Sequence, residues 1–386
     1  MVIETVGIRG HGGAAVLSEL LHWLPKLRPS WKWHVFLFDR RLREFDDPPV
    51  DNTVTMEHIL EGNRGLARLR WVNYQLQERI KQIQPDVIFS FANIGARKSL
   101  SPQVVFIQQH LVFIDEGILR HNFCLRLRMW YMRREIITGA KASRTVIVQT
   151  ETMRKRMLTY APELNGRIHV IPSGFRMLTV KPMIRPRVKE QIDSLTRPLL
   201  VYVSLPRRHK NHITLLRAFT NVLKLFPNAS LLLTEGRDDP HDRDMGKVKK
   251  GLKEEIQKLG ISDRVFWFEW LLSSEVDYAH SISDLMIFPS LAESFGLPLA
   301  EAMSIGCPIL AADLPYAHDV AGDAAIYFNP CSAEDLAERV VSGLKSPDTL
   351  RKLVKLGKDR SVLFSYEKIA NQIADILEKA AHTEID

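Results

Sequence analysis

Residues 289–306 constrain the fold of this chain more than any other stretch of the sequence. They follow a short apolar run, residues 285–289, that has the length of a buried parallel strand. Pro298 suits the first turn of a helix and Gly306 suits its end, so the predicted helix is about two turns long. Gly296 lies in the loop between strand and helix, where backbone N–H groups and the helix dipole favour an anion. The stretch therefore predicts a strand–loop–helix unit with an anion site at the helix start.

The length and composition describe a soluble protein of two domains. A chain of 386 residues suits two separate hydrophobic cores, and 45% hydrophobic with 25% charged residues is typical of a globular protein. No apolar run approaches the length of a membrane span, and Glu4 and Arg9 interrupt the N-terminus where a signal peptide would be apolar. We therefore expect a cytoplasmic protein. Cys124, Cys307 and Cys331 lack the spacing of metal ligands, so neither a disulfide framework nor a metal cofactor is expected.

The charge of the chain favours an anionic partner. The net charge is +8 and the pI is about 9.3, which suits nucleic acid, an anionic membrane surface or a phosphorylated substrate. The sequence has no zinc-finger spacing, no RNP-like aromatic motif and no long run of Lys and Arg. No nucleic acid is therefore expected as a partner. Charge alone does not choose between the other two.

Apolar runs alternate with stretches of helical periodicity along most of the chain. This alternation predicts mostly parallel sheets wrapped by helices, with ligands at the C-terminal ends of the strands. Pro182, Pro186 and Pro198 interrupt the pattern, which places a linker over residues 173–196 between domains over 1–172 and 197–365. The predicted strands are 2–7, 33–38, 86–91, 103–108, 144–149, 167–171, 199–203, 229–234, 264–268, 285–289, 308–312 and 324–328. Besides the two-turn helix that contains Pro298 and ends at Gly306, the predicted helices are 14–24, 64–84, 116–137, 212–225, 332–344, 348–363 and 366–381.

Gly12 and Gly13 belong to a glycine-rich turn predicted after the first strand. Such glycines let backbone amides approach a phosphate or a bound sugar. The spacing Gly10-x-Gly12-x-x-Ala15 also nearly fits the dinucleotide fingerprint, with Asp39 where a ribose-binding acid would lie. An NAD-dependent dehydrogenase or epimerase is therefore an alternative, although no tyrosine begins a Tyr-x-x-x-Lys pair. A plain tight turn without a ligand is a further interpretation.

Charged residues gather at two predicted loops of the second domain. Arg207, Arg208 and Lys210 precede a helix for which Asn211 is a suitable N-cap, and together they suit a diphosphate. Glu293 stands in the loop before the next helix, and Glu301 follows eight residues later. A phosphate at the helix start with carboxylates on either side is the chemistry of a sugar nucleotide. Solvated basic and acidic residues without a ligand would have the same spacing.

The segment Phe288-Pro-Ser…Glu293-Ser-Phe-Gly-Leu-Pro…Glu301-Ala-Met…Gly306-Cys-Pro resembles glycosyltransferase family 4, the retaining two-domain glycosyltransferases. The resemblance implies the GT-B fold, with two Rossmann-like domains facing a cleft. It implies a metal-independent hexosyltransferase that moves a sugar from a UDP- or GDP-linked donor to a glycan or lipid-linked acceptor, as in bacterial cell-surface polysaccharide assembly. The first domain would bind the acceptor and the second the donor, and residues 366–386 would cross back to the first domain.

The resemblance also assigns roles to individual residues. Glu293 and His110 would act on the transferred sugar, and Lys210 on the leaving diphosphate. The chain departs from the family at Leu205, where an Arg is usual, and at Glu269, where a Gly is common. The residues implied to bind the donor are Gly12, Gly13, Arg207, Arg208, Lys210, Trp270, Leu271, Ser294, Phe295, Gly296, Leu297 and Glu301.

The helix predicted over residues 116–137 has a basic face interleaved with aromatic residues. This face would dock on anionic lipid headgroups or a lipid-diphosphate acceptor, placing the protein on the inner face of the plasma membrane. Alternatively, the aromatic residues enter the core and the arginines are only solvated. The face comprises Phe123, Arg126, Trp130, Arg133 and Arg134.

Two further interpretations concern other activities. A nucleotide- or nucleic-acid-binding protein without transfer activity would show the same fold pattern. Asp242 and Asp244 resemble the metal-binding pair of single-domain glycosyltransferases, but they alternate with arginines in a turn-rich stretch, which favours a solvated loop.

Overall fold

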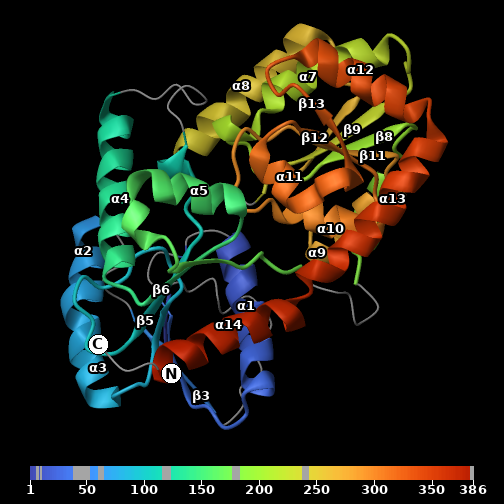
Figure 1. Cartoon of the computed structure of the whole chain (residues 1–386). Helices are drawn as coiled ribbons and strands as arrows, with labels where there is room; N and C mark the ends of the chain where they lie inside the picture. Colours follow the sequence, from blue (N-terminus) through green and yellow to red (C-terminus); the bar gives the residue numbers. More distant parts are fainter. Residues whose placement is uncertain are drawn as a thin grey trace. The chain divides into compact units, whose positions relative to one another are not determined.

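A computed structural model describes residues 1–5, 8, 11–37, 53–59, 65–114, 123–175, 183–236 and 243–382. The chain forms two compact units (Figure 1). The first comprises Met1–Gly174 together with Phe364–Asp386, and the second comprises Phe175–Leu363.

The first unit contains a parallel sheet whose described strands follow the order β3-β2-β1-β4-β5-β6-β7. Strand β3 is absent from the strands predicted above. Only one of its five residues is buried, so its sequence has neither the continuous apolar run nor the alternation of a core strand. The strands are β1 (Val2–Glu4), β2 (Trp33–Leu37), β3 (Val54–His58), β4 (Ile88–Ser90), β5 (Gln103–Ile107), β6 (Thr145–Val148) and β7 (Ile168–Val170).

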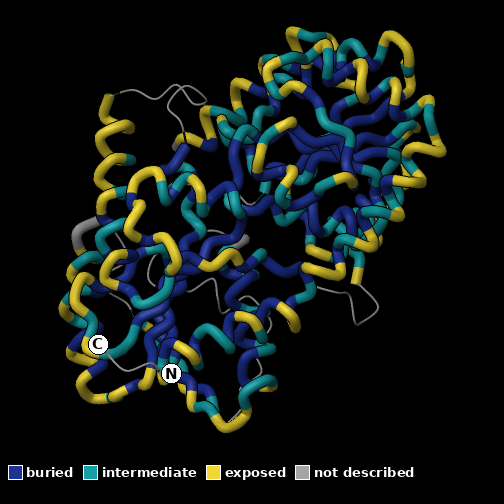
Figure 2. The backbone as a smooth tube through the Cα atoms, in the orientation of Figure 1, coloured by how far each residue is buried: buried dark blue, intermediate teal, exposed yellow. Residues whose placement is uncertain are grey.

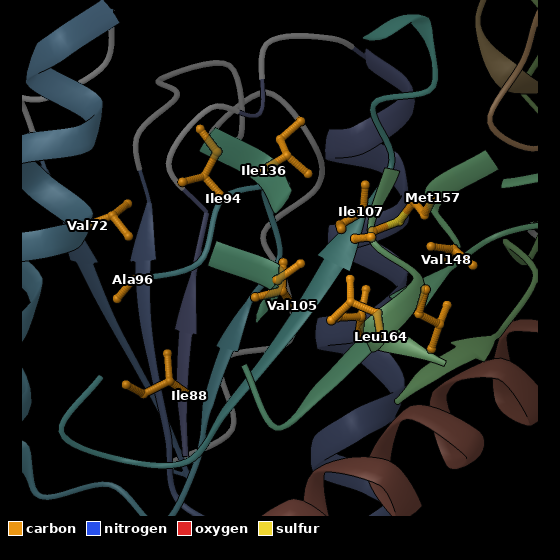
Figure 3. Packing of buried hydrophobic residues seen from close by; sticks show 14 of the residues in the cluster. Val72, Ile88, Ile94, Ala96, Val105, Ile107, Ile136, Val148, Met157 and Leu164 are labelled. Atoms are coloured by element: carbon orange, nitrogen blue, oxygen red, sulfur yellow. The ribbon is translucent and has the colours of Figure 1, made fainter. Parts of the chain in front are cut away.

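Apolar side chains from this sheet and from several helical segments form a core cluster of the first unit (Figure 3). Ile88, Val105 and Ile107 of the strands pack there with Val72 and Ile136 of the helices. Helices α1 and α14 pack against each other, and Arg28 after α1 pairs with Asp375 and Glu378 of α14. The helices are α1 (His11–Leu27), α2 (Gly65–Arg70), η2 (Trp71–Gln75), α3 (Leu76–Ile83), α4 (Phe123–Lys141), α5 (Glu151–Tyr160) and α14 (Tyr366–His382).

The second unit contains a parallel sheet whose described strands follow the order β10-β9-β8-β11-β12-β13. The strands are β8 (Leu199–Tyr202), β9 (Ser230–Thr234), β10 (Val265–Phe268), β11 (Leu285–Phe288), β12 (Ile309–Ala312) and β13 (Ala325–Phe328). The longer helices are α6 (Pro186–Asp193), α7 (His212–Leu223), α8 (Arg243–Leu259), α9 (Ser273–Ile282), α10 (Leu297–Ile305), α11 (Pro315–Ala321), α12 (Ala333–Leu344) and α13 (Pro347–Ser361).

Several predicted boundaries differ from the structure, and two of the differences concern the glycine-rich turn and the linker. Helix α1 begins at His11, so Gly12 and Gly13 lie in its first turn and not in a turn before it. The first N–H groups of a helix have no intrahelical partner, which lets a helix begin with glycine at small cost. Residues 186–193 of the predicted linker form α6, which packs on α9 within the second unit.

Both sheets have a point at which the strand order reverses. In the first unit it lies between β1 and β4, and in the second between β8 and β11. The chain leaves these neighbouring strands toward opposite sides, so the loops at their C-terminal ends open a crevice in which ligands bind in this class of sheet. The loops that follow β8 and β11 are those that contain Lys210 and Glu293.

The close approach of α4 to the loop around Gly95 predicts that Gly139→Ala destabilises the first unit. A Cβ at Gly139 would lie 2.5 Å from the Gly95 carbonyl oxygen, so backbone must move, at a cost of about 1–3 kcal/mol. Gly251→Ala is the matched control, because a Cβ there meets open space and alanine favours the helix. Urea unfolding followed by circular dichroism measures both. Equal stability of the two variants would contradict the predicted contact.

Candidate functional site

An ion pair joins the two loops at the reversal point of the second sheet. Lys210 Nζ donates a hydrogen bond to Glu293 Oε1 at 2.5 Å. The two side chains are 18% and 10% exposed, so the pair is largely removed from water. A charged pair at this depth is stable only when both partners are present. The structure therefore brings together two residues that the sequence analysis assigned to one site.

Buried tyrosine hydroxyl groups form hydrogen bonds to the backbone of the two loops that carry the ion pair. The Tyr202 hydroxyl at the end of β8 donates to the Lys210 carbonyl oxygen at 2.9 Å and lies 3.0 Å from Ser290 Oγ. The Tyr316 hydroxyl of α11 donates to the Ser290 carbonyl oxygen at 2.5 Å. Burial raises the pKa of both tyrosines, so they remain hydrogen-bond donors. Sequence reasoning missed these residues, because Tyr202 lies in an apolar strand and has the pattern of a core residue, and α11 is not among the predicted helices.

The loop 289–296 ends in a backbone conformation that requires glycine. Gly296 has φ = 93°, and a Cβ there would also crowd Phe288 and Leu299. Because glycine has no side chain to cap α10, the helix start presents its backbone to the loop. At the other end, Gly306 has φ = 86° and the Cys307 N–H donates to the Ala302 carbonyl oxygen. Both ends of α10 agree with the predicted strand–loop–helix unit.

The other residues of this segment differ in exposure. Phe295 is 2% exposed, whereas Ser294, Leu297 and Glu301 are partly buried. Loss of hydration raises the pKa of Glu301 to about 7, and the nearby charge of Asp277 on α9 adds to the rise. Glu301 is therefore close to half protonated at neutral pH and can donate as well as accept a hydrogen bond.

The basic turn before α7 is a short 3₁₀ helix, η5 (Arg208–Lys210). Arg207 is partly buried and Arg208 is exposed. Asn211 occupies the N-cap position of α7 (His212–Leu223), as predicted, but its φ is 56° and its side chain makes no capping hydrogen bond. Its side chain accepts a hydrogen bond from the Thr214 hydroxyl and donates to the Pro330 carbonyl oxygen.

A buried histidine lies directly after this turn. His212 is 2% exposed, and its ring centre lies 4.9 Å from that of Tyr202 and 6.3 Å from that of Trp267. Burial, followed by the charge of Lys210, lowers its pKa to about 3. His212 is therefore neutral, and the positive charge at this end of the sheet is carried by Lys210 and its neighbouring arginines. Sequence reasoning did not identify His212.

Trp270 and Leu271 follow β10 at the C-terminal edge of the same sheet. Trp270 is partly buried and Leu271 is 8% exposed. Glu269, at the position where the family commonly has Gly, is exposed.

In the first unit, His110 and Gln108 follow β5. His110 is buried, and a Cβ at Gly13 would lie 3.7 Å from Gln108 Oε1. The N–H groups of Gln108 and Gln109 donate to Asn93 Oδ1, which fixes the turn. The loop after β5 and the start of α1 are therefore neighbours. Asp39, the ribose-binding acid of the dehydrogenase alternative, lies outside the described residues.

Helix α4 differs from the predicted basic face at one residue. Arg133 Nη1 donates to the Val112 carbonyl oxygen, and its guanidinium lies 4.1 Å from the centre of the Tyr160 ring. Arg133 therefore packs against the first unit, and its assignment to the exposed face is wrong. Phe123, Leu127 and Trp130 form the outward stripe and are 78%, 56% and 49% exposed.

Neither a metal centre nor a membrane span is seen in the described residues. Within these ranges, no three His, Cys, Asp or Glu side chains gather in a group that could hold a metal ion. Asp242 lies outside the described residues, and Asp244 belongs to α8. None of the described helices combines the length and apolar character that a bilayer crossing requires.

Known proteins share both the sequence pattern and the fold. Residues 185–360 match the family model of the glycosyl transferases group 1. An uncharacterized glycosyltransferase of Methanocaldococcus jannaschii is 20% identical over 302 residues, which are 72% of this chain and 69% of that protein. Alpha-monoglucosyldiacylglycerol synthase of Streptococcus pneumoniae is 28% identical over 303 residues, which are 74% of this chain and 63% of the synthase. The structure of HepE from Anabaena in complex with UDP and glucose has a TM-score of 0.74 at 17% identity, covering 98% of this chain and 99% of that one.

Residues 185–360 are similar to the group 1 glycosyltransferases, and the relatives named above are a glycosyltransferase and a glycolipid synthase. The prediction that the chain is a glycosyltransferase enzyme is confirmed. The predicted GT-B fold, with two units built on parallel sheets, is confirmed. The dehydrogenase or epimerase alternative is not favoured. The narrower assignment to family 4 stays a prediction, as do the roles of the individual residues.

The raised pKa of Glu301 predicts a pH-dependent effect of Glu301→Gln on stability. The folded protein holds this proton up to about pH 7, whereas an unperturbed Glu loses it near 4.5. The contribution of Glu301 to the free energy of unfolding therefore falls as the pH rises between these values. Glutamine does not titrate, so the Tm of the variant relative to wild type should rise from about pH 5 to about pH 8. A difference in Tm that is constant over this range would show that Glu301 is an ordinary solvated carboxylate.

Proposed function

We propose that the protein transfers a hexose, with retention of anomeric configuration, from a UDP- or GDP-linked donor to a glycan or lipid-linked acceptor. The observation that carries the proposal is the Lys210–Glu293 pair at the reversal point of the second sheet, beside the start of α10, where the N-cap residue is Gly296. A diphosphate there meets an ammonium group and backbone N–H groups, and a sugar beside it meets a carboxylate. The UDP and glucose named for the HepE structure are ligands of this chemistry.

The main catalytic requirement of the proposed site is to stabilise the leaving diphosphate. Negative charge grows on it as the bond to the sugar breaks, and Lys210 with Arg207 or Arg208 would stabilise that charge. Glu301 would accept hydrogen bonds from the ribose hydroxyls. Glu293 would hold sugar hydroxyls and stabilise positive charge at the anomeric carbon, while His110 of the first unit would position the sugar. These cationic groups can act on the diphosphate without a metal ion, so we propose metal-independent transfer.

Two experiments test this proposal in sequence. A thermal-shift panel of UDP, GDP, ADP, dTDP and NAD identifies the nucleotide, because a ligand that binds only the folded state raises Tm. A shift with UDP or GDP and none with NAD is expected. No shift with any nucleoside diphosphate would contradict the proposed donor class.

With the donor identified, Lys210→Ala should lower kcat/KM about 30-fold or more, equivalent to about 2 kcal/mol of transition-state stabilisation. The leaving group loses a cation that is largely removed from water. Arg217→Ala is the control, since Arg217 forms an exposed ion pair with Glu255 on the surface of the same unit. Unchanged kcat/KM in Lys210→Ala would remove Lys210 from the mechanism.

We further propose that α4 docks the enzyme on an anionic lipid surface, as in cell-surface polysaccharide assembly at the inner face of a plasma membrane. Residues 123–128 at the start of α4 are exposed on every side of the helix (Figure 2). The outward stripe of Phe123, Leu127 and Trp130 continues to Arg134, whose guanidinium lies 5.8 Å from the Trp130 ring centre. Apolar residues flanked by arginines suit insertion at the headgroup level. The lipid product named for the Streptococcus pneumoniae synthase is consistent with such an acceptor.

The C-terminal half of α4 holds this exposed half in place. The buried Glu135 accepts two hydrogen bonds from Arg97 Nη2, at 2.9 and 2.6 Å. Gly139 lies against the backbone of Gly95. The exposed N-terminal turns of α4 therefore extend from a C-terminal half that is packed against the first unit.

Replacing Arg126, Arg128 and Arg134 together by Gln should reduce binding to anionic vesicles about a hundredfold. Each basic residue near such a surface contributes about 1 kcal/mol. Replacing Arg351, Lys352 and Lys355 by Gln is the matched control, because it removes the same charge from exposed positions of α13. Vesicle sedimentation and nucleotide affinity are measured for both. Equal loss of vesicle binding in the two variants would assign the attraction to net charge and not to α4.

A further inference from the structure

An ion pair joins the start of α6 to the start of α9, between residues 90 positions apart in the sequence. Glu275, the third residue of α9, is fully buried. Arg185, directly before α6, donates from Nε to Glu275 Oε1 and from Nη2 to Glu275 Oε2, both at 2.7 Å. Two parallel hydrogen bonds of this kind fix orientation as well as distance. The pair therefore sets the position of α9 relative to the segment before α6.

The same two side chains hold the backbone of residues 269–272, which connect β10 to α9. Arg185 Nη2 also donates to the Trp270 carbonyl oxygen at 2.8 Å, and Glu275 Oε2 accepts from the Leu272 N–H at 2.8 Å. The Arg185 guanidinium lies 5.6 Å from the centre of the Trp270 ring. The peptide groups on both sides of Leu271 are thus tied to one ion pair.

Residues 269–272 lie on the nucleotide side of the proposed site. β10 is two strands from β8, whose loop carries Lys210, so the two loops are about 10 Å apart along the edge of the sheet. Helix α9 packs on α10, and its Asp277 is close enough to Glu301 to raise the pKa of that carboxyl group. A nucleotide whose diphosphate meets Lys210 and whose ribose meets Glu301 would bring its base toward the start of α9.

We propose that the Arg185–Glu275 ion pair is a positioning device for nucleobase recognition, holding Trp270 and Leu271 where the base of the donor binds. The inference rests on the proposed function. Arg185 contacts the donor only through the segment that it holds. Its loss should therefore weaken binding of the base and leave binding of the diphosphate unchanged.

The experiment compares ligands with and without a base. Isothermal titration calorimetry gives Kd for UDP, GDP and inorganic pyrophosphate with wild type, Arg185→Lys, Arg185→Ala and Arg197→Ala. Arg197→Ala is the matched control, because Arg197 pairs with Asp284 before the N-terminal ends of β8 and β11, away from the strand ends that carry the proposed site. Arg185→Lys keeps a positive charge beside Glu275 but loses the two-point contact. If Arg185→Ala does not fold, Arg185→Lys is the variant that tests whether the two-point contact affects base binding.

In the Arg185 variants, Kd for the preferred nucleoside diphosphate should rise tenfold or more, and the ratio of the UDP and GDP constants should move toward one. Kd for pyrophosphate should stay within twofold, and Arg197→Ala should resemble wild type. Donor KM should rise more than kcat falls. A purely structural role would lower Tm without changing the UDP-to-GDP ratio, and that result would overturn the inference. Wild type that binds no nucleoside diphosphate would instead overturn the proposed function.

Discussion

The ion pair between Lys210 and Glu293 depends on the topology of the second sheet. The two residues are 83 positions apart, and only the reversal of strand order between β8 and β11 brings their loops to the same crevice. Removing both charges from water costs free energy, and the hydrogen bond between the two charged groups offsets part of that cost. The Tyr202 and Tyr316 hydroxyl groups hold the backbone of the two loops through the carbonyl oxygens of Lys210 and Ser290. The two charged groups are hydrogen-bonded to each other. An anionic donor would find a cation whose position is already fixed, so little reorganisation would accompany binding.

Much of this arrangement could be predicted from the sequence, because local signals mark it. Pro298 and Gly306 bound α10 through backbone restrictions that hold in any fold, and the apolar run before residue 289 is a buried strand in the structure. Helices α7, α12 and α13 of the same unit follow the periodicity of their apolar residues, as predicted. Helices α6, α8, α9 and α11 are not among the predicted helices. Strand β3 could not be found, because it lies at the edge of its sheet and most of its side chains are not buried.

The residues that the sequence did not reveal act through contacts between distant segments. No local pattern distinguishes Tyr202 from a core tyrosine, since its function depends on the loop that lies above it. Helical geometry alone places Arg133 on the exposed face. In the structure its guanidinium packs over the ring of Tyr160 at the end of α5 instead. The pairing of Glu275 with Arg185 could not be predicted from the sequence either. A glutamate near a helix start is normally a cap, and the added role of Arg185 appears only when α6 and α9 are packed together.

The positive charge of the chain can serve two anions in physically different ways. Lys210 is 18% exposed and has a fixed partner, so dissolved salt screens its interactions weakly. The exposed arginines of α4 act through water, where charges are screened over about 8 Å at physiological ionic strength. Binding of a lipid surface would therefore weaken with salt over a range in which donor binding changes little. This difference separates the two roles without any substitution, because it follows from burial and not from the identity of the cations.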